Sequence, residues 1–512
     1  MSSSAPPEAG SAPVSKSDGG GPDGGGLDRG VLAVAMVVVL GAIMSILDVT
    51  VVHIAVPALS QEFGAPLSQI QWVATGYTLA LATVIPVTGW AASRFGTKRL
   101  YMISLGLFVL GSALAGMAWS AESLIAFRVL QGLGGGMIMP AGMTILTQKA
   151  GPQRVGQVMS VVGIPMLLGP ISGPILGGWL VDDVSWRWIF YINVPVGIIS
   201  LFLAWRILDR DTPQPGEKLD LLGLLLLSPG LAALIYGLAT GAEKGAFDSA
   251  EVIGFTAVGA VLVAGFVVRA LSAEVPLIDL RLFKRRSVAA ASGTMVLFGL
   301  AFFGAMFLMP MYYQLVRGES AFHTGLLLIP QGLGAMVTMP IGGKLTDKIG
   351  PGRVVLAGLV LIVGGMIGFT TQMDVDTSKA VLGVALFVMG LGMGLTMMPT
   401  MSAAMQSLSH DEVPRASTAL NIIQQVAGSI GTAAISVILT TELADRLPGS
   451  GGGLGSTEEV PPEVMAQLAP KMAEAFSTTF WWALALLALA FIPALLLPRH
   501  RPETKVDVMP LH

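Results

Sequence analysis

Long apolar runs separated by short polar or charged breaks make up most of the chain. About 20 mainly apolar residues are needed for a helix to cross a bilayer, and fourteen runs reach that length. They cover residues 31–57, 69–92, 100–119, 123–147, 155–181, 188–205, 219–240, 250–270, 288–316, 325–346, 354–372, 380–406, 416–440 and 477–498. The first run is too long for a cleaved signal peptide. The pattern therefore predicts an all-α integral membrane protein with fourteen transmembrane helices.

The positions of the basic residues give the expected orientation. If successive breaks alternate between the two sides, 22 of the 29 Lys and Arg residues fall on the side of the termini. Six fall on the opposite side, and Arg128 lies within a run. Cytoplasmic segments carry the excess of Lys and Arg in membrane proteins. We therefore expect both termini to be cytoplasmic.

The runs also suggest an organisation into segments. We expect a disordered cytoplasmic tail at 1–30, a six-helix bundle at 31–206, a two-helix insert with linkers at 207–286, a second six-helix bundle at 287–498 with a long outer loop at 441–476, and a cytoplasmic tail at 499–512.

Composition excludes several classes of function. Only 12% of residues are charged, against about 25% in ordinary soluble domains. The net charge of −3 gives no reason to expect a nucleic-acid partner. We find no phosphate-binding loop for ATP, no cluster of metal ligands, no Cys, no cofactor motif and no catalytic constellation. The chain is thus not expected to be an enzyme.

One acid and one base stand out within the runs. We expect Asp48 to be the only carboxylate inside the membrane, where an acid is costly and marks a functional site by default. Burial disfavours the charged carboxylate, so Asp48 could take up and release a proton; the alternative is a permanent structural ion pair. At about 1.5 Å per residue, Arg128 lies at a depth similar to that of Asp48. We predict that the two interact, although Arg128 could instead extend to the outer surface.

Two short loops and one helix carry further patterns. The stretch Gly89–Arg99 recurs in the second half as Gly343–Gly350, and such repetition indicates two related halves. In the fifth run Gly residues recur every four positions, which favours close helix packing. The residues of interest are Arg94, Gly96, Lys98, Arg99, Asp347 and Gly350 in the loops, and Gly163, Gly169, Pro170, Gly173, Pro174 and Gly177 in the fifth run.

Polar side chains elsewhere in the runs are candidates to line a substrate cavity. They are Tyr77, Gln331, Asn421, Gln424 and Gln425, and they could equally bond neighbouring helices. Met residues at 393, 397, 398, 401 and 405 suit either a pocket for varied ligands or core packing.

Taken together, these motifs resemble the major facilitator superfamily, and more narrowly its fourteen-helix drug–proton antiporters of the EmrB/QacA type. The resemblance rests on Leu47–Pro57, Gly89–Arg99, Arg128–Gly136, Gly163–Gly178 and Trp186–Gly197. It implies a fold of two six-helix bundles plus two extra helices. It also implies that the Gly-rich fifth helix marks an antiporter and that the repeated loops latch the inner face.

The chain departs from the family pattern at one position. The acid expected in the first loop is replaced by Ser93, whereas the second loop keeps Asp347. The resemblance implies proton-coupled export of small amphipathic compounds across a bacterial cytoplasmic membrane, with protons and small molecules as partners. The alternatives are an efflux or uptake carrier for one hydrophobic metabolite and, more remotely, a membrane enzyme or receptor.

Overall fold

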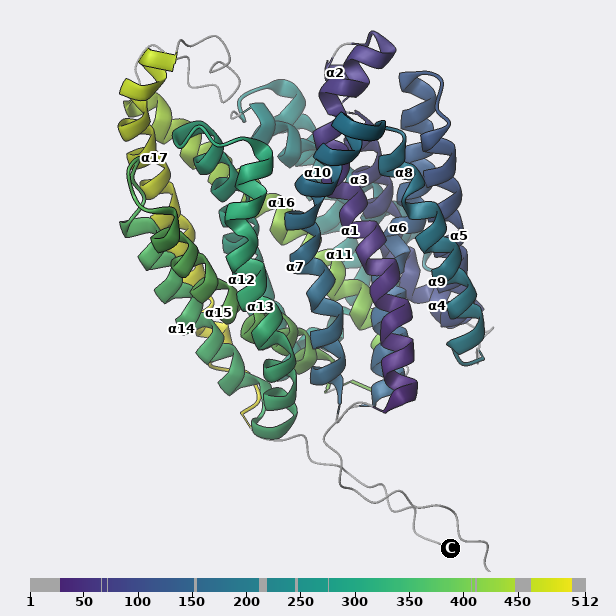
Figure 1. Cartoon of the computed structure of the whole chain (residues 1–512). Coiled ribbons are helices and arrows are strands. Elements are labelled where there is room, and N and C mark those ends of the chain that lie inside the picture. Colours follow the sequence, from purple (N-terminus) through teal and green to yellow (C-terminus); the bar gives the residue numbers. More distant parts are fainter. Residues whose placement is uncertain are drawn as a thin grey trace, which may run out of the picture.

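The computed structural model describes residues 28–499, apart from residues 66, 71, 152–153, 211–218, 245–246, 275, 407, 410–411 and 447–461. All regular elements in that part are helical (Figure 1). The predicted tails 1–30 and 499–512 lie almost wholly outside the described residues. The all-helical membrane fold is as expected, because a helix satisfies its own backbone groups in lipid.

Nine helices and two irregular turns form the N-terminal half in the described residues. They are α1 (Arg29–Phe63), α2 (Leu67–Ile70), α3 (Trp72–Val84), η1 (Ile85–Val87), α4 (Thr88–Phe95), α5 (Thr97–Gly116), α6 (Ala121–Ala150), α7 (Val155–Trp179), η2 (Leu180–Val184), α8 (Trp188–Tyr191) and α9 (Asn193–Ile207). Local sequence fixes some of the helix starts. At α6, for example, Ser120 and Ser123 cap each other's backbone N–H groups.

The rest of the described chain forms the insert and the C-terminal half. The insert is α10 (Leu221–Lys244) and α11 (Ala250–Ser272), and the C-terminal half is η3 (Leu280–Lys284), α12 (Arg286–Met311), η4 (Tyr312–Val316), α13 (Ala321–Ile349), α14 (Pro351–Thr371), α15 (Lys379–Met405), α16 (Val413–Arg446), α17 (Pro462–Leu489) and α18 (Phe491–Ala494). Thirteen helical segments of the described chain are long and apolar enough to span a membrane. The 25-residue helix α7 occupies the remaining predicted span.

The long outer loop predicted at 441–476 is mostly helical where it is described. Helix α16 continues to Arg446, and α17 begins at Pro462. The two helices thus continue beyond the predicted spans 416–440 and 477–498 into this segment. Residues 447–461 lie outside the described chain.

The start of α1 and the end of α18 lie at one end of the molecule, which we call the termini side (Figure 1). Two repeated turns lie there. Gly96, between α4 and α5, has φ 94° and ψ 147°, and Gly350, between α13 and α14, has φ 86° and ψ 148°. A positive φ of this kind favours Gly, so the sequence repeat corresponds to a repeat in backbone geometry.

The two halves are joined toward the termini side. The Ser417 hydroxyl of α16 donates to the Pro140 carbonyl of α6 at 3.1 Å. A side chain at Gly163 of α7 would come within 2.6 Å of Met339 and Met398 of the other half. Figure 1 shows the helices of the two halves converging at this end.

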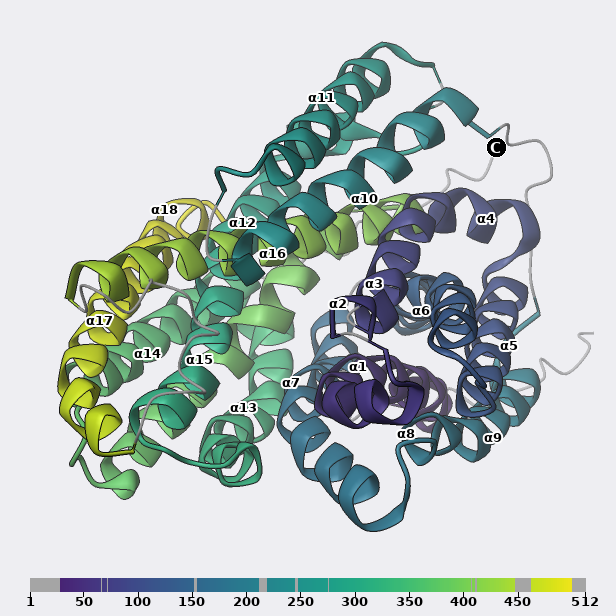
Figure 2. The ribbon, with the colours of Figure 1, turned by 90° about the horizontal axis from the view of Figure 1, so that it is seen from above.

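The insert covers the seam between α3 and α16, as Figure 2 shows. The Ser228 hydroxyl of α10 donates to the Thr83 carbonyl of α3 at 2.6 Å. Leu227 and Leu231 of α10 share an apolar cluster with Ile422 of α16. Helix α11 lies on the outside.

Candidate functional site

An ion pair lies inside the N-terminal half. Arg128 Nη1 on α6 donates a hydrogen bond to Asp48 Oδ2 on α1. Asp48 is 2% exposed and Arg128 is 1% exposed. The predicted contact is therefore present, and the alternative in which Arg128 extends to the outer surface is wrong.

Two amides complete the surroundings of the Asp48 carboxylate. Gln131 Nε2 donates to Asp48 Oδ1 at 2.8 Å, and Asn193 Nδ2 donates to the same oxygen at 3.3 Å. Arg128 Nη1 also donates to Gln131 Oε1 at 2.7 Å. The acid thus receives hydrogen bonds from α6 and α9 and links three helices through its carboxylate. We call Asp48, Arg128, Gln131 and Asn193 the Asp48 network.

Tyr77 supports this network and lies apart from the cavity described below. The Arg128 guanidinium lies 4.1 Å from the centre of the Tyr77 ring, a distance at which a cation is attracted to the ring face. Arg128 Nε donates to the Val73 carbonyl at 3.1 Å. Our prediction that Tyr77 lines a substrate cavity does not fit this position.

The sequence analysis missed Gln131 and Asn193. Gln131 lies three residues after Arg128, a spacing that puts both side chains on one face of a helix. Asn193 falls within the Trp186–Gly197 motif, where our attention went to the Trp residues. Each is a polar residue inside an apolar run, and that feature alone could have marked it as a candidate site residue.

Asp48 is not the only buried carboxylate, contrary to our expectation. The Asp220 side chain is 2% exposed and pairs with Arg269 of α11 at 3.3 Å. It precedes α10 and accepts the Gly223 N–H at 3.0 Å, as an N-cap residue does. We overlooked it because it lies at the very edge of its run. Capping of α10 therefore accounts for the burial of Asp220. Asp48 caps no helix, because it lies in the interior of α1.

The Gly stripe of α7 packs against the segment of α1 that carries Asp48. A side chain at Gly169 would overlap Ile46, one at Gly173 would overlap Thr50, and one at Gly177 would approach Val51 at 3.0 Å. Gly163 differs because it faces the C-terminal half. The side chains of Pro170 and Pro174 lie outside the described residues. The stripe thus sets the distance between α7 and the helix of the acid.

The repeated loops make different contacts. Asp347 Oδ2 accepts the Gln157 N–H at 3.3 Å, so an acid of α13 lies at the N-terminus of α7 in the other half. A negative charge is favourable at that end of a helix. The Ser93 hydroxyl donates to the Gly89 carbonyl of its own helix at 3.3 Å. Because Ser stands where the family pattern has an acid, position 93 carries no charge.

The basic loop residues lie around the α4–α5 turn. Lys98 Nζ donates to the Trp205 and Leu208 carbonyls at 2.8 and 2.7 Å, within the N-terminal half. Lys98 thereby holds the end of α9 and does not reach the other half through these bonds. Arg94 is partly exposed, and Arg99 is exposed.

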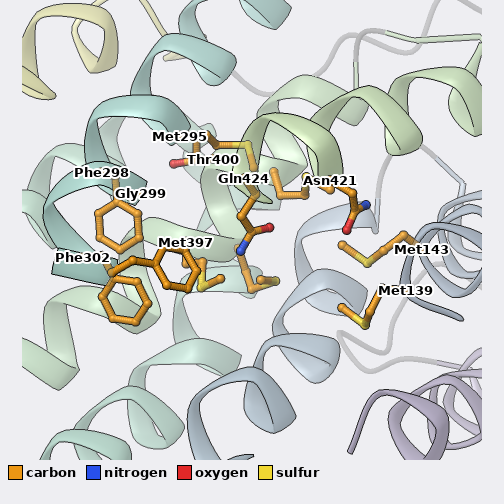
Figure 3. A pocket seen from close by; sticks show the side chains of 13 residues that line it. Met139, Met143, Met295, Phe298, Gly299, Phe302, Met397, Thr400, Asn421 and Gln424 are labelled. Carbon is orange, nitrogen blue, oxygen red and sulfur yellow. The ribbon is translucent and has the colours of Figure 1, made fainter. Parts of the chain in front are cut away.

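A cavity lies between α6 of the N-terminal half and α12, α15 and α16 of the C-terminal half (Figure 3). Its empty volume is about 540 Å³, with open space at its mouth included. It is lined by Met139 and Met143 of α6, Met295, Phe298, Gly299, Phe302 and Phe303 of α12, Met397, Met398, Thr400 and Met401 of α15, and Asn421 and Gln424 of α16.

Of the polar cavity candidates, only Asn421 and Gln424 are among these lining residues. Gln331 Nε2 instead donates to Met393 Sδ at 3.3 Å, and Gln425 lies outside the lining. Met397, Met398 and Met401 line the cavity, whereas Met393 and Met405 do not. The predicted Met cluster therefore serves both packing and the pocket. No group of residues suited to a metal ion occurs in the described chain.

Comparisons with known proteins agree with the all-helical transporter fold. Residues 38–432 match the family model described as Major Facilitator Superfamily. The chain is 44% identical to the "Multidrug resistance protein B homolog" of Mycobacterium tuberculosis, over 97% of this chain and 96% of that protein. It is 34% identical to the "Multidrug export protein EmrB" of Haemophilus influenzae, over 77% of each chain.

A solved structure shares the fold at low sequence identity. The proton:xylose symporter XylE aligns with a TM-score of 0.58 and 14% identity, over 90% of this chain and 94% of that one. The family match, the named relatives and the thirteen membrane-length helices of the described chain show a multi-pass transporter of the cytoplasmic membrane. The chain belongs to the Major Facilitator Superfamily, in the branch that contains the multidrug export protein EmrB.

Proposed function

We propose that this protein exports small amphipathic compounds in exchange for protons, and that Asp48 is the proton-binding group. The observation that carries the proposal is a buried carboxylate that receives hydrogen bonds from Arg128, Gln131 and Asn193. The names of the relatives in multidrug resistance and export support the choice of cargo.

Proton binding at Asp48 would change how three helices pack. A neutral Asp48 no longer balances the charge of Arg128, which stays protonated at any physiological pH. The attraction between α1 and α6 then weakens. The neutral carboxyl group is also a weaker hydrogen-bond acceptor for Asn193 of α9. Because α7 packs directly on this part of α1 and contacts the C-terminal half at Gly163, the change can reach the joint between the halves.

The proton gradient supplies enough energy for export. A membrane potential contributes about 2.3 kcal/mol per charge per 100 mV. That value alone supports a concentration ratio of about 50-fold, at about 1.4 kcal/mol per factor of ten. Neither ATP nor a cofactor takes part in this mechanism.

The test is compound-induced proton movement in everted membrane vesicles, with wild type compared with Asp48→Asn. Asn is nearly isosteric with Asp but cannot bind the proton. We expect a subset of compounds to collapse the pH gradient with wild type and to have no effect with the variant. Asp220→Asn is the matched control, because it removes a second buried, Arg-paired carboxylate; we expect it to keep the response.

Two results would contradict the proposal. An equal response in wild type and Asp48→Asn would show that the coupling proton binds elsewhere. No response to any compound of a broad panel would favour a carrier dedicated to one metabolite.

A further inference from the structure

We propose that the cavity between α6, α12, α15 and α16 selects uncharged, planar aromatic molecules with hydrogen-bonding substituents, and discriminates against permanent cations. This inference rests on the proposed export function and specifies its class of cargo. It follows from three properties of the lining residues: aromatic stacking surface, available amide groups and absence of charge.

The aromatic surface comes from α12. The rings of Phe298 and Phe302 are nearly parallel, with an interplanar angle of 6° and centroids 5.4 Å apart. Phe303 meets Phe302 at 67° with centroids 5.1 Å apart. Aromatic rings prefer offset-stacked and edge-on neighbours at such distances. A flat ring system can therefore contact one ring by its face and the next by its edge.

Six methionines complete the apolar surface. They are Met139, Met143, Met295, Met397, Met398 and Met401. Thioether side chains are flexible and make favourable contacts with the edges of aromatic rings. The cavity can thus adapt to the outline of a ring system while the phenylalanines set its plane.

The polar groups lie on one face of α16. Asn421 Nδ2 donates to the Ser417 carbonyl at 2.8 Å, which leaves its oxygen available. Gln424 follows three residues later, and its side chain has no hydrogen-bond partner among the described residues. In Figure 3 the Gln424 amide points between the phenylalanines and Met139. Such an amide can donate to a ligand carbonyl and accept from a hydroxyl or N–H group.

No side chain of the lining is ionisable. Arg128 of the Asp48 network precedes Met139 by eleven residues, which is about 16 Å along a helix. A buried charge without a partner is much more costly than a buried amide group. Attraction of a cation to ring faces is strongest for Trp, and the aromatic residues here are Phe. A permanent cation would therefore lose hydration without gaining a counter-charge.

The experiment compares two probes of the same ring size. Acridone is neutral and carries a carbonyl and an N–H group, whereas N-methylacridinium is a permanent cation. Binding of each to the purified full-length protein in lipid nanodiscs is measured by fluorescence, with empty nanodiscs subtracted. We expect wild type to bind acridone at least about tenfold more tightly, which corresponds to about 1.4 kcal/mol.

Variants at position 424 make the test specific. Gln424→Leu should weaken acridone binding by about tenfold, and Gln424→Glu should reverse the preference in favour of N-methylacridinium. Gln425→Leu and Gln425→Glu are the controls, because residue 425 neighbours Gln424 on α16 and does not line the cavity.

Several results would overturn the inference. Equal or tighter binding of the cation by wild type would do so, as would equal effects of the 424 and 425 variants, or binding of neither probe. These outcomes are distinct from a failure of the proposed function. Proton exchange that depends on Asp48 could be found with other compounds even if acridone did not bind.

Discussion

The Asp48 network of the N-terminal half and the cavity wall of the C-terminal half both lie between membrane helices, but their chemistry is opposite. Asp48 receives hydrogen bonds from Arg128, Gln131 and Asn193. The cavity wall has no ionisable side chain, and its Gln424 has no partner within the described structure. One region satisfies its polar groups internally, whereas the other leaves them available to a ligand.

If Asp48 binds the proton and the cavity binds the cargo, as proposed above, proton chemistry and cargo recognition are separated in space. Helix α6 connects them, since it carries Arg128 and Gln131 at one level and Met139 and Met143 at the other. On the proposed assignment, the proton and the cargo would bind to different groups in this conformation. We therefore expect coupling to pass through helix packing.

The largest effect is expected from Arg128→Met, which leaves Asp48 buried beside no cation. Breaking a buried ion pair on one side costs about 3–5 kcal/mol, whereas replacing both partners with apolar residues can be close to neutral. Thermal unfolding in detergent should show a strongly destabilised Arg128→Met and a largely restored Asp48→Leu/Arg128→Met. If the double variant were no more stable than the single one, the network would not be the closed electrostatic unit described here.

A smaller effect is expected from Gly173→Ala in α7. The new methyl group would overlap Thr50 and push α7 away from the helix of Asp48. Overpacking of this kind costs about 1–3 kcal/mol, and proton exchange should slow with it. Gly178→Ala is the control, because a side chain there meets nothing within 4 Å. Equal stability and exchange in both variants would mean that the stripe has no special role.

The smallest effect is expected from Asp347→Asn at the joint between the halves. Removing a charge from a helix N-terminus costs about 0.3–1 kcal/mol, enough to shift a two-state equilibrium up to about fivefold. The chain contains no Cys, so a single Met398→Cys reports access to the joint directly. A membrane-impermeant maleimide applied from the termini side should label it faster when residue 347 is Asn.

A matched variant sharpens this last prediction. Ser93→Asp restores the acid that the first loop lacks, beside a segment where Gly89 lies against Pro414 and Arg415 of the C-terminal half. It should slow the labelling of residue 398. Unchanged labelling in both variants would show that charge at these loops does not hold the halves together.

The fold could be predicted from the sequence because membrane helices are specified by long apolar runs, and the lipid makes helices obligatory. Within the site, Asp48 and Arg128 could be paired by depth along two helices. Gln131 and Asn193 were missed because an amide carries no charge signal, and its partner depends on helix rotation. Only some of the cavity residues could be predicted, for the same reason. Gln424 and Gln425 are adjacent, and the packing of α16 decides which of them faces the cavity.

The insert makes the molecule one-sided in the plane of the bilayer. On the flank between α3 and α16, acyl chains meet α11, whose Val261 is 71% exposed, instead of the seam between the halves (Figure 2). The bond from Ser228 to α3 is directional, whereas the contacts with α16 are apolar and tolerate sliding. We therefore expect α10 and α11 to move together with the N-terminal half when the two halves move relative to each other. Of the two flanks on which the halves meet, the one between α3 and α16 is thereby covered by the insert, whereas the one where α7 meets α13 is formed by the two halves alone.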